Sequence, residues 1–324
     1  MIKKISYALL LLLGAAGTAD AETVTWRHAI VEPKSDSGIA MMAGKSDIAG
    51  RHGLNIEYVP VKGDALALKA LIAGDVDSYE GTPGGAIIAA SRGANIKLVG
   101  CYWPGLSYGI FSTNKIATID QLKNGTFAIS NPGSLPDLIS RGILRKHNIP
   151  LSGVRFASLG GDADRFRALS QGLVDAAAIS TEFVPFAADH QVHLLFDAHQ
   201  ELPNFLRWCT YVSASKIAQD RAEVVNFVAA QMDGARFAME HKQASIDLTV
   251  KTLNLKPNDP RPVYIYDQAI KLNLLDPTMN VPMEKLGWMK QLLIDTGNLS
   301  APIDIANLVD TSIRTEALSH RLIK

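Results

Sequence analysis

The feature that most constrains this fold is an alternation of strand and helix patterns that runs twice along the chain. In the first run, strand patterns lie at 24–30, 55–61, 76–80 and 96–103, and helical patterns lie between them at 37–51, 65–73 and 84–92. In the second run, strands are predicted at 126–130, 154–159 and 174–180, and helices at 134–147, 163–171 and 182–189. Such alternation produces mostly parallel sheets with helices on both faces. We therefore predict an α/β fold with two lobes and a ligand cleft between them.

Two segments break the alternation and are interpreted as crossings between the lobes. After Pro104-Gly105, residues 108–113 have the β-branched and aromatic content of a short strand, and 206–214 is a second strand pattern. We accordingly assign residues 22–103 and 213–324 to one lobe and 104–212 to the other.

The C-terminal third is predicted to be mainly helical. Helical patterns cover 221–253 and 283–296, and Pro257, Pro260 and Pro262 between them predict breaks.

A short internal repeat supports two similar halves. Ala70–Asp77 in the first run and Ala168–Asp175 in the second share the pattern A-L-x-x-G-x-V-D. In both copies a helix is predicted to end at a glycine suited to the left-handed conformation, with a strand directly after it. Two ordinary helix–strand joints would give the same pattern by coincidence, so the repeat supports the two-lobed reading without requiring it.

The N-terminus has the layout of a cleaved secretory signal. Lys3 and Lys4 precede an apolar run from Ile5 to Ala16, and Ala19-Asp20-Ala21 suits cleavage after residue 21. We therefore expect residues 1–21 to be removed and the mature protein to lie in the periplasm. The mature chain keeps 32 − 2 = 30 basic and 32 − 1 = 31 acidic side chains, a balance that offers no basic field to nucleic acid.

Cys101 and Cys209 are the two cysteines of the chain. In an oxidising compartment they could form a disulfide, but buried free thiols are equally compatible with the sequence. The pairing stays open at this point.

Candidate ligand contacts lie in the loops that follow the predicted strands. Ligands of open α/β sheets bind beyond the carboxyl ends of the strands, where helix N-termini and free amides converge. The candidates in these loops are His28, Ser37, Thr82, Pro83, Ser130, Pro132, Gly133, Ser134, Asp162, Ser180, Thr181 and Glu182. Trp103, Tyr108 and Trp208, at the crossings, could supply aromatic walls.

The amides of Gly133 and Ser134 are predicted to hold an anionic group at the start of a helix. Carboxylates at Glu80, Asp162 and Glu182 leave open a cationic or amide-bearing ligand instead.

Enzyme and metal signatures are weak. Gly105-Leu106-Ser107-Tyr108-Gly109 fits the serine-hydrolase pattern, but a strand rather than the required helix follows the serine. The histidines at 190, 193 and 199 need not share a face. We predict no catalytic residue, no metal and no cofactor.

The order of these motifs resembles a known family. The patterns at Ala70–Asp77 with Thr82, at 129–134, at Ala168–Asp175 and at 292–318 are similar to those of the nitrate/sulfonate/taurine-type substrate-binding proteins of ABC transporters. The chain departs from that family in its first cleft loop, Glu32 to Ser37, which carries more charge.

The resemblance implies the type II periplasmic-binding fold and a monomer that catalyses nothing. It implies capture of a small organic anion, such as a sulfonate or carboxylate, and delivery to an inner-membrane permease with its ATPase. Relatives that bind pyrimidine precursors of thiamine, and enzymes built on the same scaffold, are the alternatives. The secretory leader favours a binding protein over a cytosolic enzyme.

Overall fold

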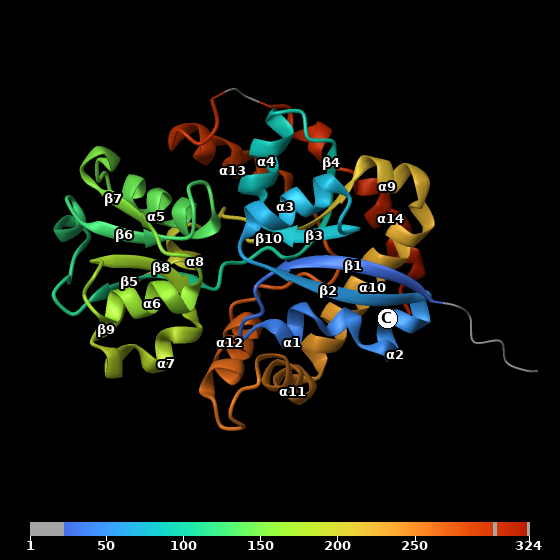
Figure 1. The fold of residues 1–324 in the computed structure, drawn as a ribbon, viewed down its shortest axis with the longest axis horizontal. Helices are drawn as coiled ribbons and strands as arrows, with labels where there is room; N and C mark the ends of the chain where they lie inside the picture. Colours follow the sequence, from blue (N-terminus) through green and yellow to red (C-terminus); the bar gives the residue numbers. More distant parts are fainter. Residues whose placement is uncertain (1–22, 301–302, 323–324) are drawn as a thin grey trace, which may run out of the picture.

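A computed structural model of the chain describes residues 23–300 and 303–322 and forms two lobes side by side (Figure 1). Each lobe has a five-stranded mixed sheet, with strand order β2-β1-β3-β10-β4 in lobe 1 and β7-β6-β8-β5-β9 in lobe 2. The predicted two-lobed α/β fold is confirmed. The predicted signal segment, 1–21, lies outside the described residues. The strands are β1 (Val24–Val31), β2 (Leu54–Val61), β3 (Ser78–Gly81), β4 (Ile96–Trp103), β5 (Tyr108–Thr113), β6 (Thr126–Ile129), β7 (Arg155–Ser158), β8 (Ala176–Ser180), β9 (Val192–Asp197) and β10 (Trp208–Ser213).

Helices cover both faces of each sheet. The α-helices are α1 (Ser37–Ala40), α2 (Ser46–Ala49), α3 (Asp64–Ala73), α4 (Pro83–Ser91), α5 (Leu135–Lys146), α6 (Asp162–Ser170), α7 (Val184–Ala187), α8 (Ala198–Glu201), α9 (Ala214–Gln219), α10 (Arg221–Glu240), α11 (Lys242–Leu253), α12 (Pro260–Lys271), α13 (Met283–Asp295) and α14 (Thr311–His320). Figure 1 shows α3 and α4 above the lobe 1 sheet and α1, α10 and α11 below it, with α5 and α6 on opposite faces of the lobe 2 sheet.

The two sheets have equivalent topology. In each, three parallel strands are followed by an antiparallel strand that belongs to the crossing: β5 pairs antiparallel with β8, and β10 pairs antiparallel with β3 and β4. Each crossing therefore delivers the fourth strand of the sheet that it enters. This pairing corrects the expected boundary, because residues 208–212 were assigned to lobe 2 but hydrogen bond in the lobe 1 sheet.

The internal repeat has the same hydrogen bonds in both lobes. Gly74 and Gly172 have φ of 82° and 68°, and the amide of the residue after each glycine donates to the carbonyl of Ala70 or Ala168. The closing aspartates also match. Asp77 accepts from the amide of Arg27 in β1, and Asp175 accepts from the amide of Thr126 in β6, both at 2.8 Å. The repeat is therefore one structural unit used twice, a helix stop followed by a carboxylate that fixes the first strand of the sheet.

Three buried clusters form the core, and the middle one belongs to both lobes. One cluster fills the space between the lobe 1 sheet and α10, and another lies under α6 and α7. The middle cluster joins the upper face of the lobe 1 sheet to α5 through Met289, Leu292 and Leu293 of α13. The lobes are therefore continuous in their apolar packing as well as in their chain.

Two predicted helices are broken. Apolar residues at 39, 42 and 43 are followed by 48 and 49, a spacing of five that would rotate the second pair off the buried face of a continuous helix. The backbone is extended at Lys45 (ψ 134°), and both groups stay buried. The helix predicted over 221–253 ends at Glu240, where the Tyr266 hydroxyl donates to the carbonyls of Ala238 and Met239.

The break predicted at Pro260 and Pro262 is wrong. Pro260 is the first residue of α12, and the Asp259 carboxylate caps it by accepting from the amide of Arg261. A proline in the first turn loses no helical hydrogen bond, because the amides there have no acceptor within the helix.

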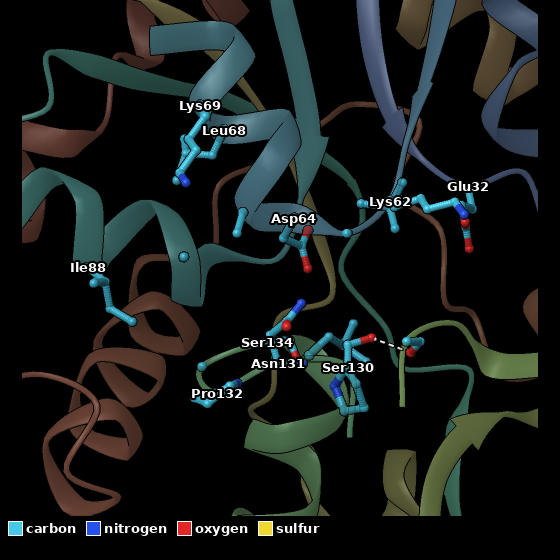
Figure 2. A pocket seen from close by; sticks show the side chains of 18 of the residues that line it. Glu32, Lys62, Asp64, Leu68, Lys69, Ile88, Ser130, Asn131, Pro132 and Ser134 are labelled. Carbon is cyan, nitrogen blue, oxygen red and sulfur yellow. Dashed lines mark hydrogen bonds between the residues drawn. The ribbon is translucent and has the colours of Figure 1, made fainter. Parts of the chain in front are cut away.

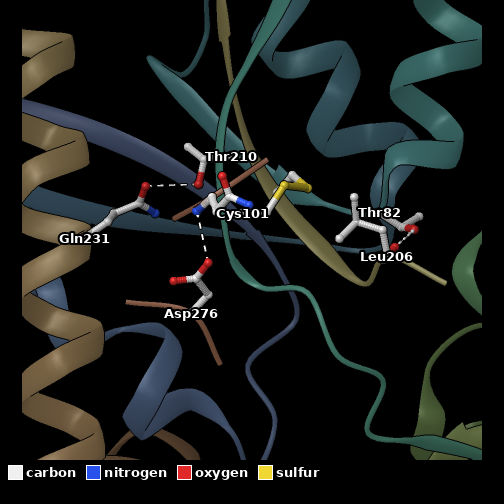
Figure 3. Close-up of a disulfide and its surroundings, with 8 residues drawn as sticks. Thr82, Cys101, Leu206, Thr210, Gln231 and Asp276 are labelled. Carbon is white, nitrogen blue, oxygen red and sulfur yellow. Dashed lines mark hydrogen bonds between the residues drawn. A yellow bond between two sulfur atoms is a disulfide. The ribbon is translucent and has the colours of Figure 1, made fainter. Parts of the chain in front are cut away.

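Cys101 in β4 and Cys209 in β10 form a disulfide, which settles the pairing that the sequence leaves open (Figure 3). Both cysteines are fully buried. The bond joins the last strand before the first crossing to the first strand after the second.

Loss of this bond is expected to destabilise the whole fold. Replacing both cysteines by serine should lower the free energy of unfolding by about 2 to 5 kcal/mol, since the bridge closes a loop of sequence separation 108. Denaturant titration of the double variant, beside the reduced and oxidised parent, measures this. A variant as stable as the oxidised parent would contradict the expectation.

Candidate functional site

A cavity of about 950 Å³ lies between the lobes, where the strand-end loops of both sheets face one another. Lobe 1 contributes the ends of β1 and β2, helix α3 and helix α4, and lobe 2 contributes residues 130–136, 160–162, 164 and 165. Figure 2 shows Asp64 and Lys69 on one side and Ser130 to Ser134 on the other. Trp208 and Tyr108, from the crossings, also line the cavity.

One buried guanidinium organises the lobe 2 wall. Arg165, which is 1% exposed, donates to Asp162, to the Ser130 hydroxyl at 2.9 Å and to the carbonyls of Gly160 and Ala178. Ser130 follows β6, Gly160 and Asp162 follow β7, and Ala178 lies within β8. Arg165 therefore holds the strand ends of lobe 2 in one arrangement.

The amides of Gly133 and Ser134, which were predicted to hold an anionic group, already donate to acceptors within lobe 2. The Gly133 amide donates to the Asp137 carboxylate at 2.8 Å, and the Ser134 amide donates to the Asn131 carbonyl. The Ser134 hydroxyl accepts from the Asn131 amide, so it does not cap α5. The loop lines the cavity, but these two amides are hydrogen bonded to Asn131 of the loop and to Asp137 of α5.

The lobe 1 wall is apolar with a basic rim. Leu68 and Ile72 of α3 and Ile88 of α4 face the cavity. At its mouth Lys62, Lys69 and Arg92 are exposed, and their side chains make no hydrogen bond or ion pair with any other residue that the structure describes.

The inner end of the cleft is a polar contact between the lobes. Lys34, in the loop after β1, reaches lobe 2, where Nζ lies 2.7 Å from Asp162 Oδ2 and 2.6 Å from the Tyr108 hydroxyl. The Tyr108 hydroxyl donates to the same carboxylate at 2.8 Å. Burial opposes the charge on Lys34, but Asp162, Tyr108 and Asp36 raise its pKa above the ordinary value. Burial alone would raise the pKa of Asp162, but Arg165 and Lys34 hold it well below the usual range.

Two further contacts tie the same loop to lobe 2 and to the second crossing. The Ser35 amide donates to Glu182 Oε2 at 2.8 Å, and Asp36 accepts from Arg207. The Arg207 guanidinium lies 3.8 Å from the ring centre of Trp208 and 4.3 Å from that of Trp103. Burial and repulsion from Asp36 raise the pKa of Glu182 to about 7.

The cavity brings together only part of the predicted site. The predicted residues that line it are Tyr108, Ser130, Pro132, Gly133, Ser134, Asp162 and Trp208. The predicted residues that are buried behind its wall are His28, Ser37, Thr82, Pro83, Trp103, Ser180, Thr181 and Glu182.

Three of the residues behind the wall hold neighbouring segments by hydrogen bonds, and two of these bonds reach the crossings. Thr82 donates to the Leu206 carbonyl, Thr181 donates to the Ser107 carbonyl, and the Ser180 amide donates to Asp162 (Figure 3 for Thr82).

His28 faces the opposite side of the sheet from the cavity. Its ring packs near Phe227 of α10, and Nδ1 hydrogen bonds the Ser78 hydroxyl at 2.7 Å. Trp26 Nε1 donates to the same Ser78 hydroxyl, and His28 Nε2 lies 3.6 Å from Glu80 Oε2. His28 is a core residue of lobe 1.

Sequence reasoning missed Lys34, Lys62, Lys69, Arg92 and Arg165. The unusual charge of the loop at 32–37 was the available signal for Lys34, because charged loop residues facing a second lobe find partners there. The rim cations lie at the end of β2, on the cleft face of α3 and at the end of α4, and local pattern does not tell which helix face meets the cleft.

Residues 50–245, more than half of the chain, match the model of the NMT1/THI5-like family. The chain belongs to this family. A search of curated protein sequences finds no match.

Solved structures share the fold of this NMT1/THI5-like protein. The periplasmic aliphatic sulphonate binding protein SsuA of Escherichia coli aligns with a TM-score of 0.71 at 20% identity, covering 89% of this chain and 92% of SsuA. The periplasmic nitrate-binding protein NrtA of Synechocystis PCC 6803 aligns with a TM-score of 0.76 at 13% identity, covering 92% and 89%. A zinc-bound ligand-binding component of an ABC-type import system from Staphylococcus aureus aligns with a TM-score of 0.73 at 15% identity, covering 91% and 99%. At these identities the likeness establishes the type II periplasmic-binding fold.

The described residues of this family member contain neither a metal-binding cluster nor a membrane-spanning helix. No cluster of three or more His, Cys, Asp or Glu side chains could hold a metal ion there. No helix in the described part of the chain is long and apolar enough to span a membrane.

The raised pKa of Glu182 predicts that the stability of the fold depends on pH. The folded state binds the proton more tightly than the unfolded state, so the contribution of Glu182 to stability falls as pH rises from about 4.5 to about 7. Glu182→Gln keeps an acceptor for Ser35 and removes the charge. It should match the parent at pH 4.5 and exceed it by roughly 1 to 3 kcal/mol above pH 7, measured by denaturant titration. The exposed Glu57→Gln variant is the control. Parallel curves for parent and Glu182→Gln would contradict the assignment.

Proposed function

We propose that this protein is the solute-binding component of an ABC importer, which captures a small organic anion between its lobes and delivers it to a membrane permease with its ATPase. The family membership and the import-system proteins among its structural neighbours support this role. The single chain supplies both walls of the cavity, so we propose that it acts as a monomer in the periplasm.

The charge of the cavity carries the choice of an anion. Five cationic side chains line it, Lys34, Lys62, Lys69, Arg92 and Arg165, against the four carboxylates Glu32, Asp64, Asp162 and Asp164. Asp162 is neutralised by Lys34 and Arg165, and Asp164 pairs with Arg167. The cations at the rim have no such partner among the described residues. An incoming oxyanion would meet an electropositive mouth.

The size and apolar wall of the cavity favour an organic solute over an inorganic ion. A volume of about 950 Å³ is at the upper end of ordinary small-molecule pockets, and nitrate would leave most of it to water. Leu68, Ile72 and Ile88 offer apolar contact beside the rim. An anion with an aliphatic or aromatic body complements both features.

Closure follows from contacts to both walls. A solute that touches the α3 and α4 side of lobe 1 and the Ser130 to Ser134 loop of lobe 2 binds the closed form better than the open one, and only such differential affinity shifts the equilibrium.

A pyrimidine-type ligand is the second candidate, favoured by one observation. Tyr108 and Trp208 both line the cavity, and their rings could pack against a planar heterocycle. We propose no catalytic role. Ser107 of the hydrolase-like motif is 2% exposed, and β5 rather than a helix follows it.

A ligand screen tests the proposal. Thermal unfolding of the mature protein should shift upward with butanesulfonate or hexanoate and not with nitrate, since a ligand at a hundred times its Kd adds about 2.7 kcal/mol. Aminopyrimidines form the second arm. No shift with any of these compounds would contradict the proposed class.

The rim cations should each contribute modestly to affinity. Lys69→Gln or Arg92→Gln should weaken binding of the stabilising anion by about two- to fivefold, because both groups are exposed and screened by water. The exposed Lys271→Gln, outside the cavity, is the matched control. Calorimetric titration measures the change, and equal affinities in all four proteins would remove the rim from the site.

A further inference from the structure

The inner end of the cleft holds a built cation site. Asp162 presents Oδ2 to Lys34, while its Oδ1 accepts from Arg165 at 2.5 Å and from the Ser180 amide at 3.1 Å. The Tyr108 hydroxyl donates to Oδ2, so its own oxygen is free to accept from Lys34. Asp162 and Tyr108 are 6% and 2% exposed, so the acceptors are fixed and largely removed from water.

The face of the aromatic ring adds to this site. Lys34 Nζ lies 5.3 Å from the ring centre of Tyr108, within the range of a cation–π contact. A carboxylate, a phenol oxygen and a ring face together complement an ammonium group.

The surroundings of this site carry an excess of carboxylates. Burial raises the pKa of both Asp64 and Glu182, and attraction to Lys34 counteracts it in each case. Asp36 and Asp162 also attract Lys34. Against these four carboxylates stand two guanidinium groups, Arg165 paired with Asp162 and Arg207 paired with Asp36. Without Lys34 the inner cleft would hold four carboxylates against two guanidinium groups.

Lys34 reaches the site from the other lobe. It belongs to the loop after β1, and its acceptors belong to β5 and α6 of lobe 2. The side chain is therefore a tethered ligand that enters the cleft in the way a free amine would.

We propose that the Asp162–Tyr108 end of the cleft is an ammonium-binding site that the chain fills with its own Lys34, and that this lysine excludes cationic solutes. The inference rests on the proposed solute-binding function and refines it. Lys34 is in this view a specificity-determining residue, since its removal turns a cleft closed to amines into one that binds them.

Chemical rescue tests this inference. In Lys34→Ala, n-butylammonium should bind where the lysine side chain was and raise the thermal unfolding midpoint by at least about 3 °C at saturation. The parent should show no such rise. Lys69→Ala, which removes another lysine from the same cavity, is the matched control and should show no rise with n-butylammonium.

Two comparisons separate an ammonium site from a simple void. Butanol has the same length and no charge, so n-butylammonium should bind Lys34→Ala at least about tenfold more tightly than butanol does. Adding Asp162→Asn should abolish that preference. Equal binding of amine and alcohol, or rescue that survives Asp162→Asn, would overturn the proposal.

The ammonium-site proposal can still be tested if Lys34→Ala folds poorly. Refolding yield from denaturant, with and without n-butylammonium, then makes the same comparison, and no gain over butanol overturns the proposal. The anion screen of the parent protein is independent of these results. Failure of rescue with intact anion binding therefore rejects the lysine assignment alone, whereas loss of all ligand-induced shifts in the parent rejects the proposed function.

Discussion

The return of the chain as β10 between β3 and β4 is the constraint on which the two-lobed arrangement depends. This strand runs antiparallel to both neighbours and completes the lobe 1 sheet from a segment that has just left lobe 2. It brings Trp208 to the cavity and Arg207 to Asp36. Its equivalent in lobe 2 is β5, which brings Tyr108 to the same place. The cleft exists because both sheets are completed by the crossings.

The lobes meet through two kinds of contact with different properties. Around α13 the contact is apolar and continuous with the cores, which suits permanent packing. At the loop after β1 the contact consists of charges and single hydrogen bonds from Lys34, Ser35 and Asp36. Polar contacts of this kind exchange with water at modest net cost, so they suit a surface that opens and closes. The cavity therefore lies between the apolar contact around α13, which stays packed, and the polar contact at the loop after β1, which can open.

Much of this fold could be predicted from the sequence, because its information is local. The strand and helix alternation, the glycine stops at Gly74 and Gly172 and the strand that follows Pro104-Gly105 depend on neighbours in the chain. The prediction at Pro260 was wrong because proline breaks a helix at an interior position but is favoured in the first turn, where Pro260 lies.

The site was less predictable, because its decisive contacts join distant segments. Lys34 and Asp162 lie far apart in the sequence and in different lobes, and Arg165 looks like an ordinary surface residue of an amphipathic helix. Gly133 lies in a strand-end loop, where ligands of α/β sheets bind, but its amide donates to the Asp137 carboxylate one turn further along. A pattern shows which loops meet, and only the three-dimensional arrangement shows which of their polar groups are still available.

The disulfide between Cys101 and Cys209 changes the covalent connectivity of lobe 2. Nearly all of lobe 2 is strung between these two residues, so the bond turns it into a ring that starts and finishes inside lobe 1. A single proteolytic cut anywhere along that ring leaves both fragments covalently joined. Lobe 2 can therefore be cleaved once, or can unfold locally, while Cys101 and Cys209 stay joined within the lobe 1 sheet.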